Sequence, residues 1–284
     1  MSDFTVRTAR AEDLPALKEI WKASFDDSED YINRFQKMFF EPRHCYLAEA
    51  DGRAVSALYL LDGPVLHGGR KLKLKGLYVF AFATLPAYRG RGIGSAVYKA
   101  CCESVLSDSA DIVCVHPAEP SLFPYYEGLA PCATIAACRE YTLSREELQI
   151  PFHPACMRIG AEQYAVMRNS MLENLPHAEM NESFLDLQEL HAELFDGDFF
   201  VMSGGIACTQ QEGDTCHIKE LLIPGGDELD AIAALAAFCP AQKYTARAPL
   251  FFDGPGQTRR LVLGTLREGL KAPGEETWWG PVFD

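Results

Sequence analysis

The sequence predicts a fold of the α/β or α+β class, in which a mixed, mostly antiparallel sheet is flanked by helices. Short apolar or alternating runs, typical of strands, are interleaved with segments whose apolar residues recur at helical spacing. Asp51-Gly52 joins two apolar runs, which predicts a hairpin and therefore antiparallel pairing. A strand–loop–helix–strand unit follows the hairpin, and this order of elements predicts a layered sheet with helices packed on it.

The first half of the chain gives a strand, two helices, a hairpin and then the strand–loop–helix–strand unit. Leu14, Leu17, Trp21 and Phe25 share one helical face, and so do the apolar residues spaced by four after Gly92. The expected strands are 4–9, 45–61 as a hairpin, 71–85, 111–116 and 132–143, and the expected helices are 13–25, 31–40, 92–106 and a short one within 121–129.

The second half follows a break at 147–154, where two prolines interrupt the pattern. We therefore expect two domains, 1–148 and 155–284. The expected helices of the second half are 161–175, 184–194 and 225–239, and the expected strands are a hairpin over 199–223, 243–252 and 259–266.

The two halves resemble each other in the order of their elements. "ATLPAYRGRGIGSAVYKAC" (83–101) matches "LLIPGGDELDAIAALAAFC" (221–239), but the second stretch lacks the arginines and the repeated glycines. We interpret this as an internal duplication with one functional and one degenerate copy. Two unrelated domains are the alternative.

Composition narrows the class of protein. The 284 residues carry 40 acidic and 26 basic side chains, a net charge of -14, which disfavours binding to nucleic acid or to an anionic membrane surface. The ten cysteines form no C-x-x-C pair, so we expect buried thiols rather than zinc sites or disulfides. The N-terminus has no apolar core of a signal peptide and no run is long enough to span a membrane, so we expect a cytoplasmic protein without a membrane partner.

The loop "RGRGIG" (89–94) lies between a buried strand and a helix, a position suited to phosphate because turning glycines and a helix start both present backbone N–H groups. A glycine-rich turn with solvated arginines is the simpler alternative. No lysine follows Gly94, which excludes a P-loop, and the next strand ends in His116 without an acidic residue for ribose, which disfavours a dinucleotide site. Basic residues gather around this loop: Arg70, Lys71, Lys73, Lys75, Arg89, Arg91 and Lys99.

The stretch "TLPAYRGRGIGSAV" resembles the acyl-CoA loop of the GCN5-related N-acetyltransferase (GNAT) family, Arg/Gln-x-x-Gly-x-Gly/Ala, with Arg89, Gly92 and Gly94 at the motif positions. "YYEGLAP" resembles the downstream motif of the family, with Tyr126 on its tyrosine, although Pro131 stands where an aromatic residue is common. "RTARAEDLPALKEIW" is similar to the usual first strand and helix. The resemblance covers about residues 1–145.

The resemblance implies acetyl-CoA as cosubstrate and no metal. The pyrophosphate would lie on the amides of residues 89–95, and the pantetheine arm would lie along residues 82–84 like an added strand. A backbone N–H near Phe82 would stabilise the oxyanion. The expected cofactor-binding residues are Phe82, Ala83, Thr84, Arg89, Gly90, Arg91, Gly92, Ile93, Gly94 and Ser95.

Tyr126 is the expected general acid, since a phenol keeps its proton at neutral pH and the leaving thiolate needs one. Its alternative role is core packing beside Tyr125 and Phe123. The base that accepts the proton of the amine is left open between Glu49 and the terminal carboxylate of Asp284.

The leading hypothesis is therefore an acetyl-CoA-dependent N-acetyltransferase, in which the primary amine of a small molecule or peptide attacks the thioester directly. A non-catalytic acyl-CoA-binding or regulatory module is the alternative. The acceptor and the oligomeric state are not determined by the sequence.

Overall fold

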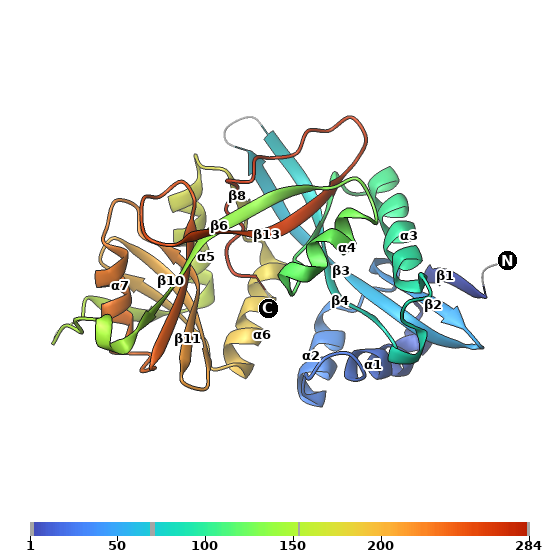
Figure 1. The fold of residues 1–284 in the computed structure, drawn as a ribbon, viewed down its shortest axis with the longest axis horizontal. Coiled ribbons are helices and arrows are strands. Elements are labelled where there is room, and N and C mark those ends of the chain that lie inside the picture. Colours follow the sequence, from blue (N-terminus) through green and yellow to red (C-terminus); the bar gives the residue numbers. More distant parts are fainter. Residues whose placement is uncertain (1–2, 69–71, 153, 283–284) are drawn as a thin grey trace. The chain divides into compact units, whose positions relative to one another are not determined.

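The computed structural model describes residues 3–68, 72–152 and 154–282. The chain forms two compact units, each built from separate stretches of sequence (Figure 1). The first unit contains residues 1–63, 74–133 and 263–271, and the second contains residues 64–73, 134–262 and 272–284. Strands β3 (Arg53–Gly68) and β13 (Gln257–Leu266) each contribute residues to both units.

The sheet of the first unit has the strand order β1-β2-β3-β4-β5, followed by the end of β13. β2 is antiparallel to β1 and β3, whereas β5 is parallel to β4 and antiparallel to β13. Asp51 and Gly52 both have positive φ at the turn between β2 and β3, which confirms the predicted hairpin. The remaining strands of this unit are β1 (Phe4–Thr8), β2 (Cys45–Ala50), β4 (Leu72–Thr84) and β5 (Ile112–Val115).

The helices of the first unit begin and end where the local sequence supplies caps and apolar faces. The Ser28 side chain accepts a hydrogen bond from the Tyr31 amide at the start of α2, and Glu29 and Asp30 favour the positive end of that helix. α1 ends at Lys22, earlier than predicted, and buries Trp21 against Phe35, with ring centroids 4.8 Å apart. The helices are α1 (Leu14–Lys22), α2 (Glu29–Phe39), α3 (Ile93–Asp108) and the short α4 (Phe123–Glu127).

The strands of the second unit have the order β6-β12-β11-β10-β9-β7. β11 and β12 are parallel, and the other pairs are antiparallel. The short strand β8 pairs with the end of β3. The elements are β6 (Ala133–Ser144), β7 (Cys156–Ile159), α5 (Ala161–Leu172), β8 (His177–Glu179), α6 (Glu182–Leu194), β9 (Asp198–Met202), β10 (Gly205–Glu212), β11 (Thr215–Leu222), α7 (Glu228–Leu235) and β12 (Lys243–Pro249).

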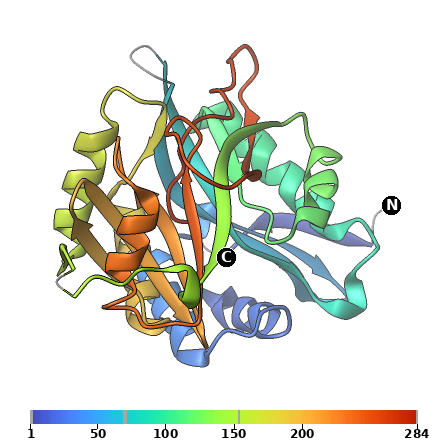
Figure 2. The same cartoon turned by 60° about the vertical axis from the view of Figure 1, so that its left-hand side comes forward.

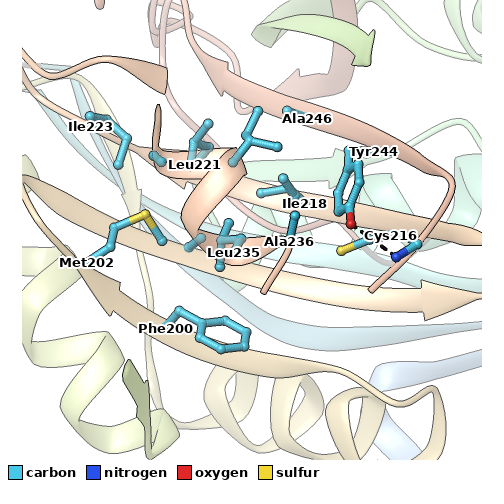
Figure 3. Close-up of a cluster of buried hydrophobic side chains, with 14 residues drawn as sticks. Phe200, Met202, Cys216, Ile218, Leu221, Ile223, Leu235, Ala236, Tyr244 and Ala246 are labelled. Carbon is cyan, nitrogen blue, oxygen red and sulfur yellow. Dashed lines mark hydrogen bonds between the residues drawn. The ribbon is translucent and has the colours of Figure 1, made fainter. Parts of the chain in front are cut away.

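The core of the second unit lies between α7 and the sheet (Figures 2 and 3). Ile232 and Leu235 from α7 pack with Phe200, Ile218 and Tyr244 from three strands, and all five are fully buried. Burial of apolar side chains on this scale is the main source of stability of such a unit.

The predicted hairpin over 199–223 is a three-stranded meander, because a second turn at Gly204, with φ +83°, separates β9 from β10. Strands β7 and β8 were not predicted, since three or four residues are too short to show alternation. The predicted fold class, a mixed and mostly antiparallel sheet with flanking helices, is confirmed.

The two units share one strand order. In the first unit, β4 is the last of four neighbouring strands, helix α3 follows it, and the next strand, β5, is parallel to β4. In the second unit, β11 is the last of four neighbouring strands, helix α7 follows it, and the next strand, β12, is parallel to β11. The antiparallel neighbour of β5 is β13, whereas the antiparallel neighbour of β12 is β6. This order is the one expected of a duplication, which itself stays a prediction together with the boundary between 148 and 155.

Candidate functional site

The C-terminal end of β4 has an open edge. β4 and β5 pair only from Gly76↔Ile112 to Val79↔Val115, and β4 then continues through Phe80 to Thr84. Ala81 has φ +44° at the point where the pairing has ended, a conformation that costs an L-residue roughly 1–2 kcal/mol. The backbone edge of residues 81–84 on the β5 side can therefore accept an additional extended segment.

The end of β4 is fixed from β3, its other neighbour. The Ser56 hydroxyl donates to the Ala83 carbonyl at 2.9 Å and lies 2.8 Å from the Thr84 hydroxyl. The Leu85 amide donates to the Val55 carbonyl at 2.8 Å. These bonds hold the strand end rigidly in front of the glycine-rich loop.

The loop after β4 makes one 3-10 turn, Pro86–Tyr88, and then uses glycines. Gly90 and Gly92 both have φ +74°, and a Cβ at either position would meet no atom within 4 Å. Glycine is therefore required for conformation and not for space. The Tyr88 hydroxyl donates to Asp51 at 3.0 Å, and the Arg91 guanidinium lies 5.2 Å from the Tyr88 ring, so the hairpin turn and the loop support each other.

Helix α3 begins directly against the end of β4. A Cβ on Gly94 would lie 3.0 Å from the Thr84 hydroxyl and 3.4 Å from both the Phe82 ring and the Tyr125 hydroxyl. Gly92 occupies the N-cap position and offers no side-chain cap, so the first-turn amides have neither an intrahelical nor a capping partner. Arg89 adds formal charge and is anchored by its Nε donating to the Thr84 carbonyl at 2.9 Å. The arrangement can bind an anionic group at the helix start.

Tyr126 lies in α4 within an aromatic group that reaches β4. Its ring centroid is 5.6 Å from that of Tyr98 and 6.4 Å from that of Phe82. Burial, with a smaller contribution from Tyr125, raises the pKa of Tyr126 above its usual value, so the phenol stays protonated at neutral pH. No described residue forms a hydrogen bond with its hydroxyl. This placement is compatible with both predicted roles, the general acid and the packed core residue.

The structure brings all ten predicted cofactor-binding residues, 82–84 and 89–95, into one region of the first unit. Glu49 lies on β2 instead, two strands from β4, and its carboxylate forms an ion pair with Arg7 at 2.6 Å. The role of Glu49 as the base stays a prediction. Asp284, the other candidate, lies outside the described residues, as do Arg70 and Lys71 of the basic group.

Ser56 and Ala81 shape the end of β4, and the prediction from the sequence included neither of them. A single serine within "AVSALYLL" is a polar interruption of an apolar strand, and this signal was available. Its side chain is fully buried and serves β4. The sequence carries no signal for the positive φ of Ala81, because alanine occurs in all regular elements.

Comparison with known proteins places the chain in a class. Its fold is that of the acyl-CoA N-acyltransferases: a mixed sheet whose parallel pair opens at the start of a helix. Residues 5–129 match the family model of the acetyltransferase (GNAT) domain. Residues 5–129 therefore form a GNAT domain, and the family predicted from the sequence is confirmed for this part of the chain.

Solved structures give the same fold over both units. A GCN5-related N-acetyltransferase from Kribbella flavida is 15% identical with a TM-score of 0.67, and the match covers 92% of this chain and 70% of that one. Eis1 from Mycobacterium abscessus is 11% identical (TM-score 0.62; 93% and 74% covered), and a GCN5-related N-acetyltransferase from Sphaerobacter thermophilus is 14% identical (TM-score 0.54; 95% and 98% covered). Comparison with curated protein sequences gave no match. Together with the domain, these likenesses support a general acetyltransferase function.

Within residues 3–68, 72–152 and 154–282, no group of three or more His, Cys, Asp and Glu side chains is arranged to hold a metal ion. None of the helices described has both the length and the apolar character that a membrane span requires.

Proposed function

We propose that the protein is an acetyl-CoA-dependent N-acetyltransferase that acetylates a primary amine of a small molecule or peptide. The observation that carries the proposal is the junction of β4 and α3. There the uncapped helix start, with no Cβ at Gly94, abuts residues 81–84 of β4, which lie beyond the pairing with β5. An anionic group and an extended arm could thus be bound side by side, as one continuous ligand requires.

The residues of the first unit fit coenzyme A. The amides of residues 89–95 would hold the pyrophosphate, helped by Arg89 and Arg91, because they combine free N–H groups with positive charge. The main chain of Phe82, Ala83 and Thr84 would hold the pantetheine arm in the manner of an added strand. When bound, acetyl-CoA supplies the thioester carbonyl that the acceptor amine attacks.

The protein's own groups would act on the two charges that this attack creates. A backbone N–H near Phe82 would donate to the developing oxyanion, in a strand end that Ser56 already holds in place. Tyr126 would give its proton to the departing thiolate. Its raised pKa keeps the phenol protonated before the reaction, so the proton is present when the thiolate departs.

A non-catalytic acyl-CoA-binding module is the second candidate, and the tight aromatic packing of Tyr126 favours it. Both candidates require coenzyme binding, and they differ in turnover. A screen of acceptor amines for release of free coenzyme A thiol, run with wild type and Tyr126→Phe, separates them. Turnover by wild type that falls in the variant supports the enzyme, whereas binding without turnover for every amine class supports the module.

We also propose that residues 155–284 are a degenerate GNAT-like domain and that the protein is cytoplasmic. The shared strand order supports the first of these. At the helix start of the second unit, the Asp227 carboxylate accepts hydrogen bonds from the amides of Leu229 (2.8 Å) and Asp230 (3.3 Å). In α7 the Asp227 carboxylate therefore already binds first-turn amides that correspond to those proposed to bind phosphate in α3. For this reason we assign one coenzyme site to the chain.

The binding part of the proposal is tested by thermal denaturation. Acetyl-CoA should raise the melting temperature by mass action, and NADH should not. No shift with acetyl-CoA would remove the coenzyme assignment. A shift that survives Gly92→Trp would move the site elsewhere.

A further inference from the structure

A group of thiols lies in the second unit, outside the proposed acetyltransferase site. Cys216 at the start of β11 is a fully buried member of the core beneath α7, and Cys156 and Cys239 are partly buried side chains packed against that core. All three are unpaired thiols in the structure. The proposed function uses none of them.

Tyr244 brings Cys239 next to Cys216. Tyr244 is the register partner of Cys216 across the parallel pair β11 and β12. Its hydroxyl donates to the Cys239 carbonyl at 3.1 Å and accepts from the Ala241 amide at 3.0 Å, which fixes the turn after α7. Figure 3 shows the Cys216 sulfur beside this same hydroxyl, so the Cys216 side chain points at the turn that carries Cys239.

The surroundings of the three thiols shift their pKa values in different directions. The Cys239 sulfur lies 3.9 Å from the Thr209 hydroxyl and shares a hydrogen bond with the Cys216 thiol. That bond is the main cause that lowers the pKa of Cys239 and raises the pKa of Cys216. Burial raises the pKa of Cys156 to about 11. The thiolate is the reactive form of cysteine, so the lowered pKa favours Cys239 as the nucleophile of the group.

We propose that Cys239 and Cys216 form a reversible oxidation site for small hydroperoxides, with Cys239 as the attacking and Cys216 as the resolving cysteine. The Cys239 thiolate attacks one peroxide oxygen; an S–O bond forms, the O–O bond breaks, and the departing oxygen takes up a proton to leave as water or an alcohol. The Cys216 sulfur then attacks the sulfenic sulfur of Cys239. An S–S bond forms, and the hydroxide that leaves takes the Cys216 proton and becomes water.

The accessibility of the two cysteines fits their roles. Cys239 is partly exposed, so a small hydroperoxide can reach it, whereas Cys216 is shielded from solvent and can react only with its neighbour. Two electrons pass from the thiols to the peroxide, and a dithiol reductant reverses disulfide formation by exchange. The product would join the start of β11 to the turn after α7.

The experiment is a hydrogen peroxide titration of the full-length protein, followed by alkylation and non-reducing peptide mapping. We expect a Cys216–Cys239 disulfide that disappears on treatment with dithiothreitol. We expect Cys239 to react at least about tenfold faster than Cys156 or Cys132, the other partly buried cysteines. A disulfide between Cys239 and Cys156, or equal reactivity of the three, would overturn the assignment.

Variants test the two roles separately. Cys216→Ala should leave Cys239 as a sulfenic acid that dimedone labels, and Cys239→Ser should abolish both labelling and disulfide. Cys156→Ser is the matched control and should leave the disulfide intact. The peptide map of the wild-type protein alone shows whether the disulfide forms. The proposal can therefore be refuted even if one of the variants does not fold.

Discussion

Gly92→Ala gives a direct test of the loop geometry. Gly92 has φ +74° at the N-cap of α3, and a Cβ there would meet no atom within 4 Å, so the only penalty for alanine is its backbone conformation. That conformation costs an L-residue roughly 1–2 kcal/mol. We expect the free energy of unfolding to fall by about 1 kcal/mol if the loop keeps its shape.

If the loop of Gly92→Ala changes its conformation instead, the free energy of unfolding should stay the same and the affinity for acetyl-CoA should fall. In that case the affinity for acetyl-CoA should fall by about tenfold for each 1.4 kcal/mol of conformational energy transferred to binding. We therefore predict the sum of the loss in free energy of unfolding, measured by urea denaturation, and the loss in binding free energy, measured by calorimetric titration with acetyl-CoA.

Gly160→Ala is the matched control, because Gly160 also has open space around its Cβ position but an ordinary φ of -75° at a helix N-cap. We expect a change within about 0.5 kcal/mol there. Gly92→Asn should cost less than Gly92→Ala, since asparagine tolerates the left-handed region. Equal losses for Gly92→Ala and Gly160→Ala, or no loss in either measurement for Gly92→Ala, would refute the reasoning.

Four other predictions follow from particular contacts. Tyr126→Phe should keep the affinity for acetyl-CoA and lower kcat by about 10²-fold or more, measured by thiol release, and unchanged kcat would remove the acid role. Asp227→Ala should lower the free energy of unfolding by about 1 kcal/mol through loss of the α7 cap, seen in urea denaturation, without altering the acetyl-CoA stoichiometry. Burial lowers the pKa of His177 to about 4, so the folded state binds fewer protons than the unfolded state between this pH and about 6.5. The free energy of unfolding should therefore fall as the pH decreases from about 6.5 to 4, by at most roughly 3 kcal/mol. His177→Gln should lack this part of the pH dependence. Glu220→Gln should destabilise by about 3 kcal/mol or more, because it leaves the fully buried Arg168 guanidinium without its carboxylate; a smaller loss in denaturation would contradict that view of the pair.

Local signals in the sequence predict much of the site. Asp51-Gly52 predicts the hairpin turn because both residues accept positive φ, and "RGRGIG" predicts a loop and helix start because glycines and arginines occur together. The family resemblance then assigns a ligand class to that loop. These features depend on residues close together in the chain, where pattern and chemistry coincide.

The remainder depends on contacts between distant segments, which periodicity does not encode. No pattern in 263–266 indicates that these residues pair with β5, or that β6 pairs with β12. The positive φ of Ala81 arises where β4 leaves β5, and the strands themselves carry no mark of that point. The cap on α7 is different, because Asp227 before a helical run is a visible capping signal, and its carboxylate accepts hydrogen bonds from the first amides of that helix.

The central claim is that the chain has one acyl-CoA site, at the start of α3. Isothermal titration of the wild-type protein with acetyl-CoA tests it most directly, with NADH as the control ligand and Gly92→Trp as the control variant. We expect one site per chain, competition by free coenzyme A, no heat with NADH, and no binding by the variant. Two sites per chain, or binding that Gly92→Trp leaves unchanged, would contradict it.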